Sequence, residues 1–181
     1  VGAGASRLIS GTLPPHQKLE RDLAQLKNVE ASLTFSSGYA TNMGVIPSLA
    51  KPNSLILADR LCHASLIDGC RLSRATLRVF HHNDLDHLQR LLFKQRSRAS
   101  TLIITEGVFS MDGDLAPLPE MVRLAQEFEA TLLGDDAHGT GVMGATGRGT
   151  VEHYGLDPGH ILHMGTLSKA IGSSGGFVAG P

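Results

Sequence analysis

The chain is short of the residues that mark several classes of protein. It has no tryptophan, two tyrosines and six phenylalanines among 181 residues. It carries 16 basic and 17 acidic residues, a net charge of −1, whereas a nucleic-acid groove or a site for anionic membranes needs a basic excess. It lacks a run of about 18 apolar residues, which a membrane-spanning helix requires. We therefore expect no nucleic-acid partner and no membrane insertion.

Cysteine is rare as well. Cys62 and Cys70 are the two cysteines, and their spacing does not form a CxxC motif. This usage suits a reducing compartment better than a disulfide framework, because small secreted domains stapled by disulfides are rich in cysteine. We expect two buried free thiols in a cytoplasmic protein.

Short apolar segments alternate with amphipathic ones along the whole chain. Strands are expected at 31–36, 54–59, 76–80, 101–105, 131–135, 161–165 and 176–179. Helices are expected from Pro14, from Gly38, over about 64–73, from Leu85 to the basic cluster 94–98, and over about 118–128. Pro47 should end or kink the second of these helices. The alternation predicts one α/β domain over residues 1–181, with a mostly parallel sheet covered by helices on both faces.

Polar side chains follow six of the expected strands. In open α/β sheets the ligand lies beyond the carboxyl ends of the strands. The segments at those ends are 36–39, Asp59 with His63, 81–84, 106–114, 135–138 and 165–169. Six such segments on one edge of a sheet predict a composite site.

Individual residues of this edge each allow two interpretations. Lys169, among small residues, is either a Schiff-base lysine or a solvated loop residue. Asp135 is either a helix N-cap or a buried partner for a pyridinium nitrogen, with His138 placed to donate to a ring oxygen. His63 either stacks on an aromatic ring or caps a helix. Residues 36–38 open a helix, whose free N–H groups could bind phosphate.

Two other patterns are weaker. Residues 139–144 fit GxGxxG, but a dinucleotide fingerprint requires the glycines to form the strand-to-helix turn itself. Here 135–138 intervene and a glycine-rich loop follows over about 139–149. Residues 81–87 are rich in histidine and aspartate, but Asp84 and Asp86 suit the start of the next helix better than a metal site. We therefore expect no metal.

Taken together, the motifs resemble the α-oxoamine synthase family of fold type I pyridoxal-phosphate (PLP) enzymes. The resemblance runs from residues 4–11 to 175–178. The motifs that carry it lie at 37–42, 63–69, 105–114, 135–141, 147–149 and 165–169. The amino-acid sequences of 105–114 and 135–141 are most similar to those of the branch of the family that serves biotin biosynthesis.

The resemblance implies a role for each matching residue. Lys169 would hold PLP covalently, Asp135 would pair with its pyridine nitrogen and His138 would contact its phenolic oxygen. His63 would stack on the ring. The remaining cofactor contacts would be Gly38 and Tyr39 near the phosphate, Thr166 with a hydroxyl on it, and Ser110. Gly134 is a departure, since family members usually carry a bulky apolar residue there, and its small size could loosen the wall behind Asp135.

The implied activity is a PLP-dependent acyltransferase. It would condense an amino acid, L-alanine in the biotin branch, with an acyl-CoA or an acyl carrier protein thioester, and release CO2. Glycine C-acetyltransferase or 5-aminolevulinate synthase activity is the alternative within the family. A dinucleotide-dependent enzyme built on the GxGxxG match is the alternative outside it.

The resemblance also implies an assembly and a domain organisation. Family members are typically homodimers, and residues 4–11 could lie near the interface. Residues 1–181 correspond to the large cofactor-binding domain, with an N-terminal segment and a C-terminal small domain missing. We therefore expect this stretch alone to bind PLP poorly and not to turn over, so a non-catalytic fragment is a further alternative.

Overall fold

The structure, a computed structural model, describes residues 2–94 and 100–181. The helices are α1 (Pro14–Lys27), α2 (Gly38–Leu49), α3 (Ala64–Leu72), α4 (Leu85–Lys94), α5 (Leu118–Glu127) and α6 (Thr150–His153). The strands are β1 (Ala31–Phe35), β2 (Leu55–Asp59), β3 (Thr76–Phe80), β4 (Thr101–Glu106), β5 (Thr131–Asp135), β6 (Leu162–Thr166) and β7 (Gly176–Gly180). A π-helical turn at Arg7–Gly11 and a 3-10 turn at Pro158–His160 complete the regular elements of the described residues.

The strands form one sheet in the order β1-β7-β6-β5-β4-β2-β3. The pairs from β3 to β6 are parallel, whereas β7 runs antiparallel to both β1 and β6. Every expected strand is present within a residue or two of its predicted bounds, because short apolar runs between turn residues can be buried in few other ways. The mostly parallel α/β fold is thereby confirmed.

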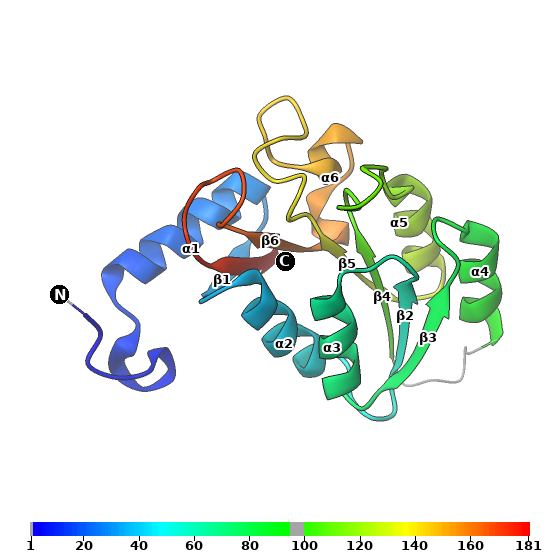
Figure 1. Cartoon of the computed structure of the whole chain (residues 1–181), viewed down its shortest axis with the longest axis horizontal. Coiled ribbons are helices and arrows are strands. Elements are labelled where there is room, and N and C mark those ends of the chain that lie inside the picture. The colour runs from blue at the N-terminus through cyan, green and yellow to red at the C-terminus, as the bar shows by residue number, and fades with distance from the viewer. Residues whose placement is uncertain (1, 95–99) are drawn as a thin grey trace.

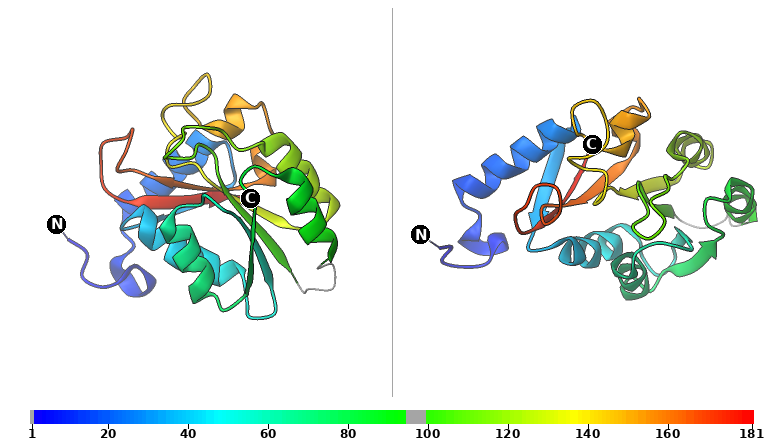
Figure 2. Two further views of the ribbon diagram at one scale, coloured as in Figure 1. Left: turned by 45° about the vertical axis from the view of Figure 1, so that its right-hand side comes forward. Right: turned by 45° about the horizontal axis from the view of Figure 1, so that its top comes forward.

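Helices cover both faces of this sheet (Figures 1 and 2). One apolar cluster joins α4, α5 and α6 to the face that presents Leu55, Leu57 and Ile103. A second joins α2 and α3 to the face that presents Ile56 and Ile104. This division follows from the pleat, which sends neighbouring side chains of a strand to opposite faces. A third cluster packs α1 against β7.

Helix α2 bears on the expectation that Pro47 ends or kinks it. Pro47 lies inside the helix, which continues to Leu49, so the proline does not end it. Proline lacks an N–H and therefore removes one hydrogen bond from the last turn. The next turn is still closed, because the Ala50 N–H donates to the Ile46 carbonyl at 2.9 Å. The basic cluster expected at 94–98 lies outside the described residues after Lys94.

The N-terminal residues extend away from the body of the molecule (Figure 1). Arg7 ties them back, since its guanidinium lies 2.8 Å from Glu20 on α1 and donates to the Thr34 carbonyl of β1 at 3.0 Å. Leu8 and Ile9 are 93% and 78% exposed. No helix among the described residues has the length and hydropathy to cross a bilayer.

Candidate active site

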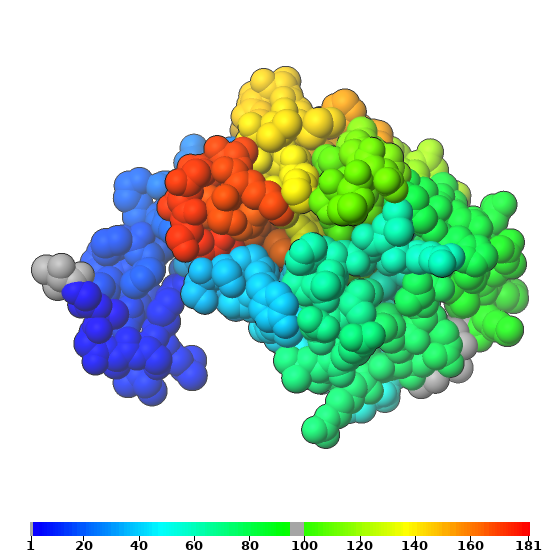
Figure 3. All heavy atoms as spheres, viewed as in Figure 1, coloured from blue at the N-terminus to red at the C-terminus, as the bar shows by residue number. Residues whose placement is uncertain are grey.

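A cavity of about 210 Å³ opens at the carboxyl ends of β4, β5 and β6. It is lined by Ser37, Gly38, Tyr39, His63, Ser65, Glu106, Asp135, Ala137, His138, Met164, Thr166, Ser168 and Lys169. In Figure 3 the segments that contribute them meet on the face turned to the viewer. Of the eight residues that the sequence assigned to a cofactor site, this cavity brings together all but Ser110.

The wall at the start of α2 is built from amides and hydroxyls. Ser37 caps the helix, accepting the Ala40 N–H on its Oγ at 3.0 Å. Thr166 Oγ1 lies 2.8 Å from Ser168 Oγ and donates to the Gly175 carbonyl at 3.0 Å. A helix N-terminus combined with hydroxyl groups suits an anion such as phosphate.

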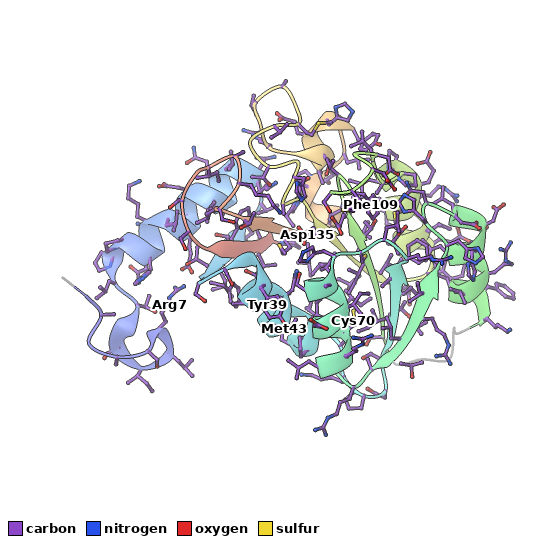
Figure 4. All side chains as sticks on the ribbon, viewed as in Figure 1. Arg7, Tyr39, Met43, Cys70, Phe109 and Asp135 are labelled. Atoms are coloured by element: carbon purple, nitrogen blue, oxygen red, sulfur yellow. The ribbon has the colours of Figure 1, made fainter. Side chains whose placement is uncertain are left out.

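The side chain of Tyr39 is held by a residue of a neighbouring helix. Its hydroxyl donates to Asp68 Oδ2 on α3 at 3.2 Å, so the end of its ring is held toward α3 (Figure 4). Any contact of this residue with an anion at the helix start would therefore come from its backbone.

Asp135 forms the opposite wall as a buried carboxylate, 5% exposed, at the end of β5 (Figure 4). Its Oδ1 accepts the Ala137 N–H at 3.0 Å. Turns follow it rather than a helix, so the interpretation as a helix cap is wrong and the buried carboxylate is confirmed. Burial raises its pKa to about 6, because a charged carboxylate loses hydration there.

Glu106 is a site residue that the sequence did not single out. It pairs with Asp135 across β4 and β5, and its Oε1 accepts the His63 N–H at 2.5 Å. Burial and the neighbouring Asp135 raise its pKa to about 7, while Lys169 opposes the rise. The signal was available: an acidic residue ends an apolar strand beside another strand that also ends in an acid.

For His63 the structure confirms the helix cap, whereas the stacking interpretation stays a prediction. The His63 Nδ1 accepts the Ser65 N–H at 3.2 Å, so the residue caps α3. The same residue lines the cavity, where an aromatic ligand could meet its ring. His138 lies half-buried on the other side, and burial together with the charges of Lys169 and His63 lowers its pKa.

Lys169 lies in the exposed turn after β6. Its charge lowers the pKa of both Glu106 and Asp135, which places its ammonium within electrostatic reach of both carboxyls. The cavity therefore holds an amine opposite two buried acids. Such an arrangement can bind a carbonyl-bearing ligand covalently and balance a cation on its ring.

Three other expectations meet different outcomes. Ser110 lies in an exposed turn and is not among the lining residues of the cavity. Residues 136–149 form turns, so the strand–glycine turn–helix context of a dinucleotide fingerprint is absent there. Gly134, suspected of loosening the wall behind Asp135, does not: a Cβ on it would meet Ile161 at 3.5 Å, on the opposite face of β5.

The histidine-rich segment at 81–87 comprises the turn before α4 and the first residues of that helix. Within the described part of the chain, one set of possible metal ligands comes within 4.8 Å of one another, namely His81, Asp84 and His87. Asp84 Oδ1 accepts the His87 N–H at 2.8 Å, as a helix cap does. His87 Nδ1 accepts the His81 N–H at 3.2 Å. These atoms already have structural partners.

Comparison with known proteins gives a consistent result. The family model described as aminotransferase class I and II matches residues 1–181. An 8-amino-7-oxononanoate synthase from Exiguobacterium sibiricum is 51% identical over 99% of this chain and 46% of its own length. A solved serine palmitoyltransferase from S. paucimobilis with bound PLP–myriocin aldimine superposes with a TM-score of 0.93 at 38% identity, over 98% of this chain and 44% of that one. A solved 8-amino-7-oxononanoate synthase from Francisella tularensis gives 0.83 at 29% identity, over 100% and 50%.

Proposed function

Because the chain belongs to the class I and II aminotransferase family, we propose that its cavity binds PLP and that the protein is a PLP-dependent acyltransferase. One observation carries the proposal. A single cavity joins the Lys169 amine, the buried Asp135 carboxylate and the amide-rich start of α2. These three groups match the aldehyde, the ring nitrogen and the phosphate of PLP.

The residues present fit this cofactor. A carboxylate whose pKa is raised by burial is stabilised when a cation lies against it, and a protonated pyridine nitrogen is such a cation. The Ser168 hydroxyl and the N-terminus of α2 supply donors for a phosphate, whereas the one proton of Thr166 Oγ1 is donated to the Gly175 carbonyl. His63 and His138 line the space between these two ends.

Bound PLP supplies an electron sink for the pair left at the α-carbon of an amino acid when a bond to that carbon breaks. Lys169 would provide the amine that holds the cofactor, and its free Nζ would be the base for the α-proton. Asp135 would hold a proton on the ring nitrogen. His138 would donate a hydrogen bond to the phenolic oxygen, and His63 would shield the site from water.

We propose L-alanine and a pimeloyl thioester as the substrates and 8-amino-7-oxononanoate as the product. The proposal is supported by relatives of that name with 49–56% identity over nearly the whole chain. The serine palmitoyltransferase structures, at 37–39% identity, favour L-serine with palmitoyl-CoA as the second candidate. Both would be decarboxylative condensations in this cavity.

The test is a substrate comparison on the protein at its natural length. The purified enzyme, loaded with PLP, is offered L-alanine, glycine or L-serine with pimeloyl-CoA, acetyl-CoA, succinyl-CoA or palmitoyl-CoA, and CoA release and the amino ketone are measured. We expect the highest kcat/KM for L-alanine with pimeloyl-CoA. A preference for another pair of amino acid and acyl-CoA would reassign the substrates. The absence of a borohydride-sensitive visible band would overturn the assignment of PLP as the cofactor.

The chain spans about half the length of the curated relatives that it matches. We propose that residues 1–181 are the large cofactor-binding domain of the acyltransferase. We also propose a homodimer, supported by the exposure of Leu8 and Ile9 in the extended N-terminal segment. A cytoplasmic location is supported by two buried cysteines that are both free.

A further inference from the structure

His82 lies between two carboxylates that come from different strand ends. Its Nδ1 is 2.9 Å from Asp59 Oδ1, at the end of β2. Its Nε2 is 2.7 Å from Asp114 Oδ2, in the loop that follows β4. A carboxylate can only accept, so both hydrogen bonds exist together only when both ring nitrogens carry protons. Partial burial disfavours that charged form, but the bonds to Asp59 and Asp114 outweigh it and raise the pKa of His82 above its usual range.

The surroundings of the ring are otherwise neutral. The edge of Phe109 meets it at 4.5 Å between ring centroids. Asn83 supports the same two acids, donating from its N–H to Asp59 Oδ2 and from Nδ2 to Asp114 Oδ2, both at 2.9 Å. His81 pairs instead with Asp84, which leaves Asp59 and Asp114 as the charged groups that face His82.

The turn that begins at Asp59 leads to His63, which lines the cavity, and the loop that ends at Asp114 directly follows Glu106, which also lines it. Asp59 accepts the Leu61 N–H at 2.8 Å and so shapes the turn that leads to His63. Asp114 closes the loop 107–114, since its carbonyl accepts the Phe109 N–H at 3.0 Å. The His63 N–H in turn binds Glu106, the residue before that loop. The His82 imidazole therefore joins the ends of β2, β3 and β4 beside the site.

We propose that His82 is a positioning residue, a protonation-dependent clasp between the 59–63 turn and the 107–114 loop. The imidazolium holds both segments. The neutral ring can donate from one nitrogen only and turns the lone pair of the other toward a carboxylate, so the imidazole bond to one segment is lost and that segment is held by Asn83 alone. The inference rests on the proposed function only in taking the adjacent cavity as the cofactor site.

The direction of the pH effect follows from the raised pKa. A histidine that binds its proton more tightly when folded contributes stability in full below its unfolded pKa, about 6.5. That contribution is lost as the pH rises through the folded value. The clasp is therefore closed below the unfolded pKa and opens as the pH rises through the raised folded pKa of His82.

The experiment measures the clasp without relying on catalysis. Hydrogen exchange of the peptides covering 59–66 and 107–114, corrected for the intrinsic pH dependence of exchange, is followed from pH 5.5 to 9 in the protein at its natural length. We expect protection of at least one segment to fall about tenfold or more as His82 deprotonates, since a hydrogen bond to a charged group is lost. The variant His82→Gln should show low protection and no step, whereas the control His81→Gln should behave as wild type.

An NMR titration of the His82 ring in the unsubstituted protein needs no variant and should give a pKa above about 6.5. A pKa at or below that value, flat protection across the pH range, or a step that survives in His82→Gln would overturn the clasp. Exchange is measured with and without PLP. A failure of the proposed function would appear separately, as a missing visible band in a protein whose exchange still shows the step.

Discussion

Lys27 Nζ lies 2.8 Å from Asp136 Oδ2, and both side chains are buried although 109 positions separate them in the sequence. Lys27 also donates to Thr140 Oγ1 at 2.8 Å and to the Arg148 carbonyl at 2.6 Å. Asp136 accepts from Thr150 Oγ1 at 2.8 Å. The pair links α1 to the segment that carries Asp135 and His138, and its remaining hydrogen-bonding positions are satisfied.

Removing the cation of this pair should destabilise the fold strongly. Lys27→Met leaves the Asp136 charge buried and uncompensated, which costs about 3 to 5 kcal/mol. Urea unfolding followed by circular dichroism measures the loss. The control Lys18→Met breaks an exposed pair with Asp22 on the same helix and should change the free energy of unfolding little. Equal effects of the two variants would contradict a structural role for the buried pair.

Lys169→Ala should abolish covalent cofactor attachment. The variant loses the amine that opens onto the cavity, so the visible band of lysine-bound PLP and its trapping by borohydride should both disappear. Lys51→Ala, which replaces an exposed lysine outside the cavity, is the control and should keep both signals. Retention of the band together with turnover in Lys169→Ala would assign the attachment to another residue.

The two buried acids should make the cofactor-free protein less stable as the pH rises. Their folded pKa values, about 6 for Asp135 and about 7 for Glu106, exceed the unfolded values of about 4. The folded state therefore holds more protons than the unfolded state between about pH 4 and pH 7, and the free energy of unfolding falls across that window.

The difference in Tm between wild type and Asp135→Asn isolates this contribution, with Glu106→Gln as the parallel measurement. Each variant should lose less stability than wild type as the pH rises from 4 to 7. A steeper loss in the variants would show that these carboxyls are charged in the folded protein throughout. Asp135→Asn should also weaken PLP binding and nearly abolish turnover.

Two glycines of the site region should respond oppositely to a methyl group. At Gly134 an added Cβ makes an ordinary contact at 3.5 Å, so Gly134→Ala should be neutral or stabilise by up to about 1 kcal/mol. At Gly149 the Cβ would lie 1.6 Å from Asp136 Oδ2 on a backbone with φ of +108°, so Gly149→Ala should destabilise by about 2 kcal/mol or more. Thermal unfolding of both variants tests this contrast, and similar Tm values for Gly134→Ala and Gly149→Ala would contradict it.

The exposed apolar residues of the N-terminal segment should support the dimer. Replacing Leu8 and Ile9 together by serine removes two largely exposed apolar side chains and should shift the protein toward monomer in light scattering. The control Leu72→Ser replaces an exposed leucine at the end of α3 and should leave the mass unchanged. An unaltered dimer in the first variant would place the interface elsewhere.

The strands and the residues at their ends could be predicted because they follow from local patterns. A run such as 101–105 must be buried on both faces, and an acid or a lysine directly after such a run must lie at the edge of the sheet. Asp135 was predicted as the last residue of such a run, and Lys169 within the segment 165–169 at the end of another. The same reasoning placed Glu106 in the segment 106–114 at this edge but gave it no role, because its contacts with Asp135 and the His63 N–H are not visible in the local sequence.

Long-range partners could not be predicted from local patterns. Lys27 lies on an amphipathic helix, where a lysine normally faces solvent, and nothing near it in the sequence indicates Asp136. The antiparallel direction of β7 depends likewise on which strands it meets. The link of His82 to Asp59 and Asp114 requires the ends of three strands to be brought together first.

The placement of β7 has a consequence for how the chain is assembled during synthesis. Among the described strands β1 pairs with β7 alone, and β7 joins it to β6. Residues 31–35 thus leave the ribosome early but have no neighbour in the sheet until residues 176–180 have been made. Closing so long a loop is entropically costly and slow. We therefore expect the start of α2, which follows β1 and borders the cavity, to be among the last parts of the site to reach its final position.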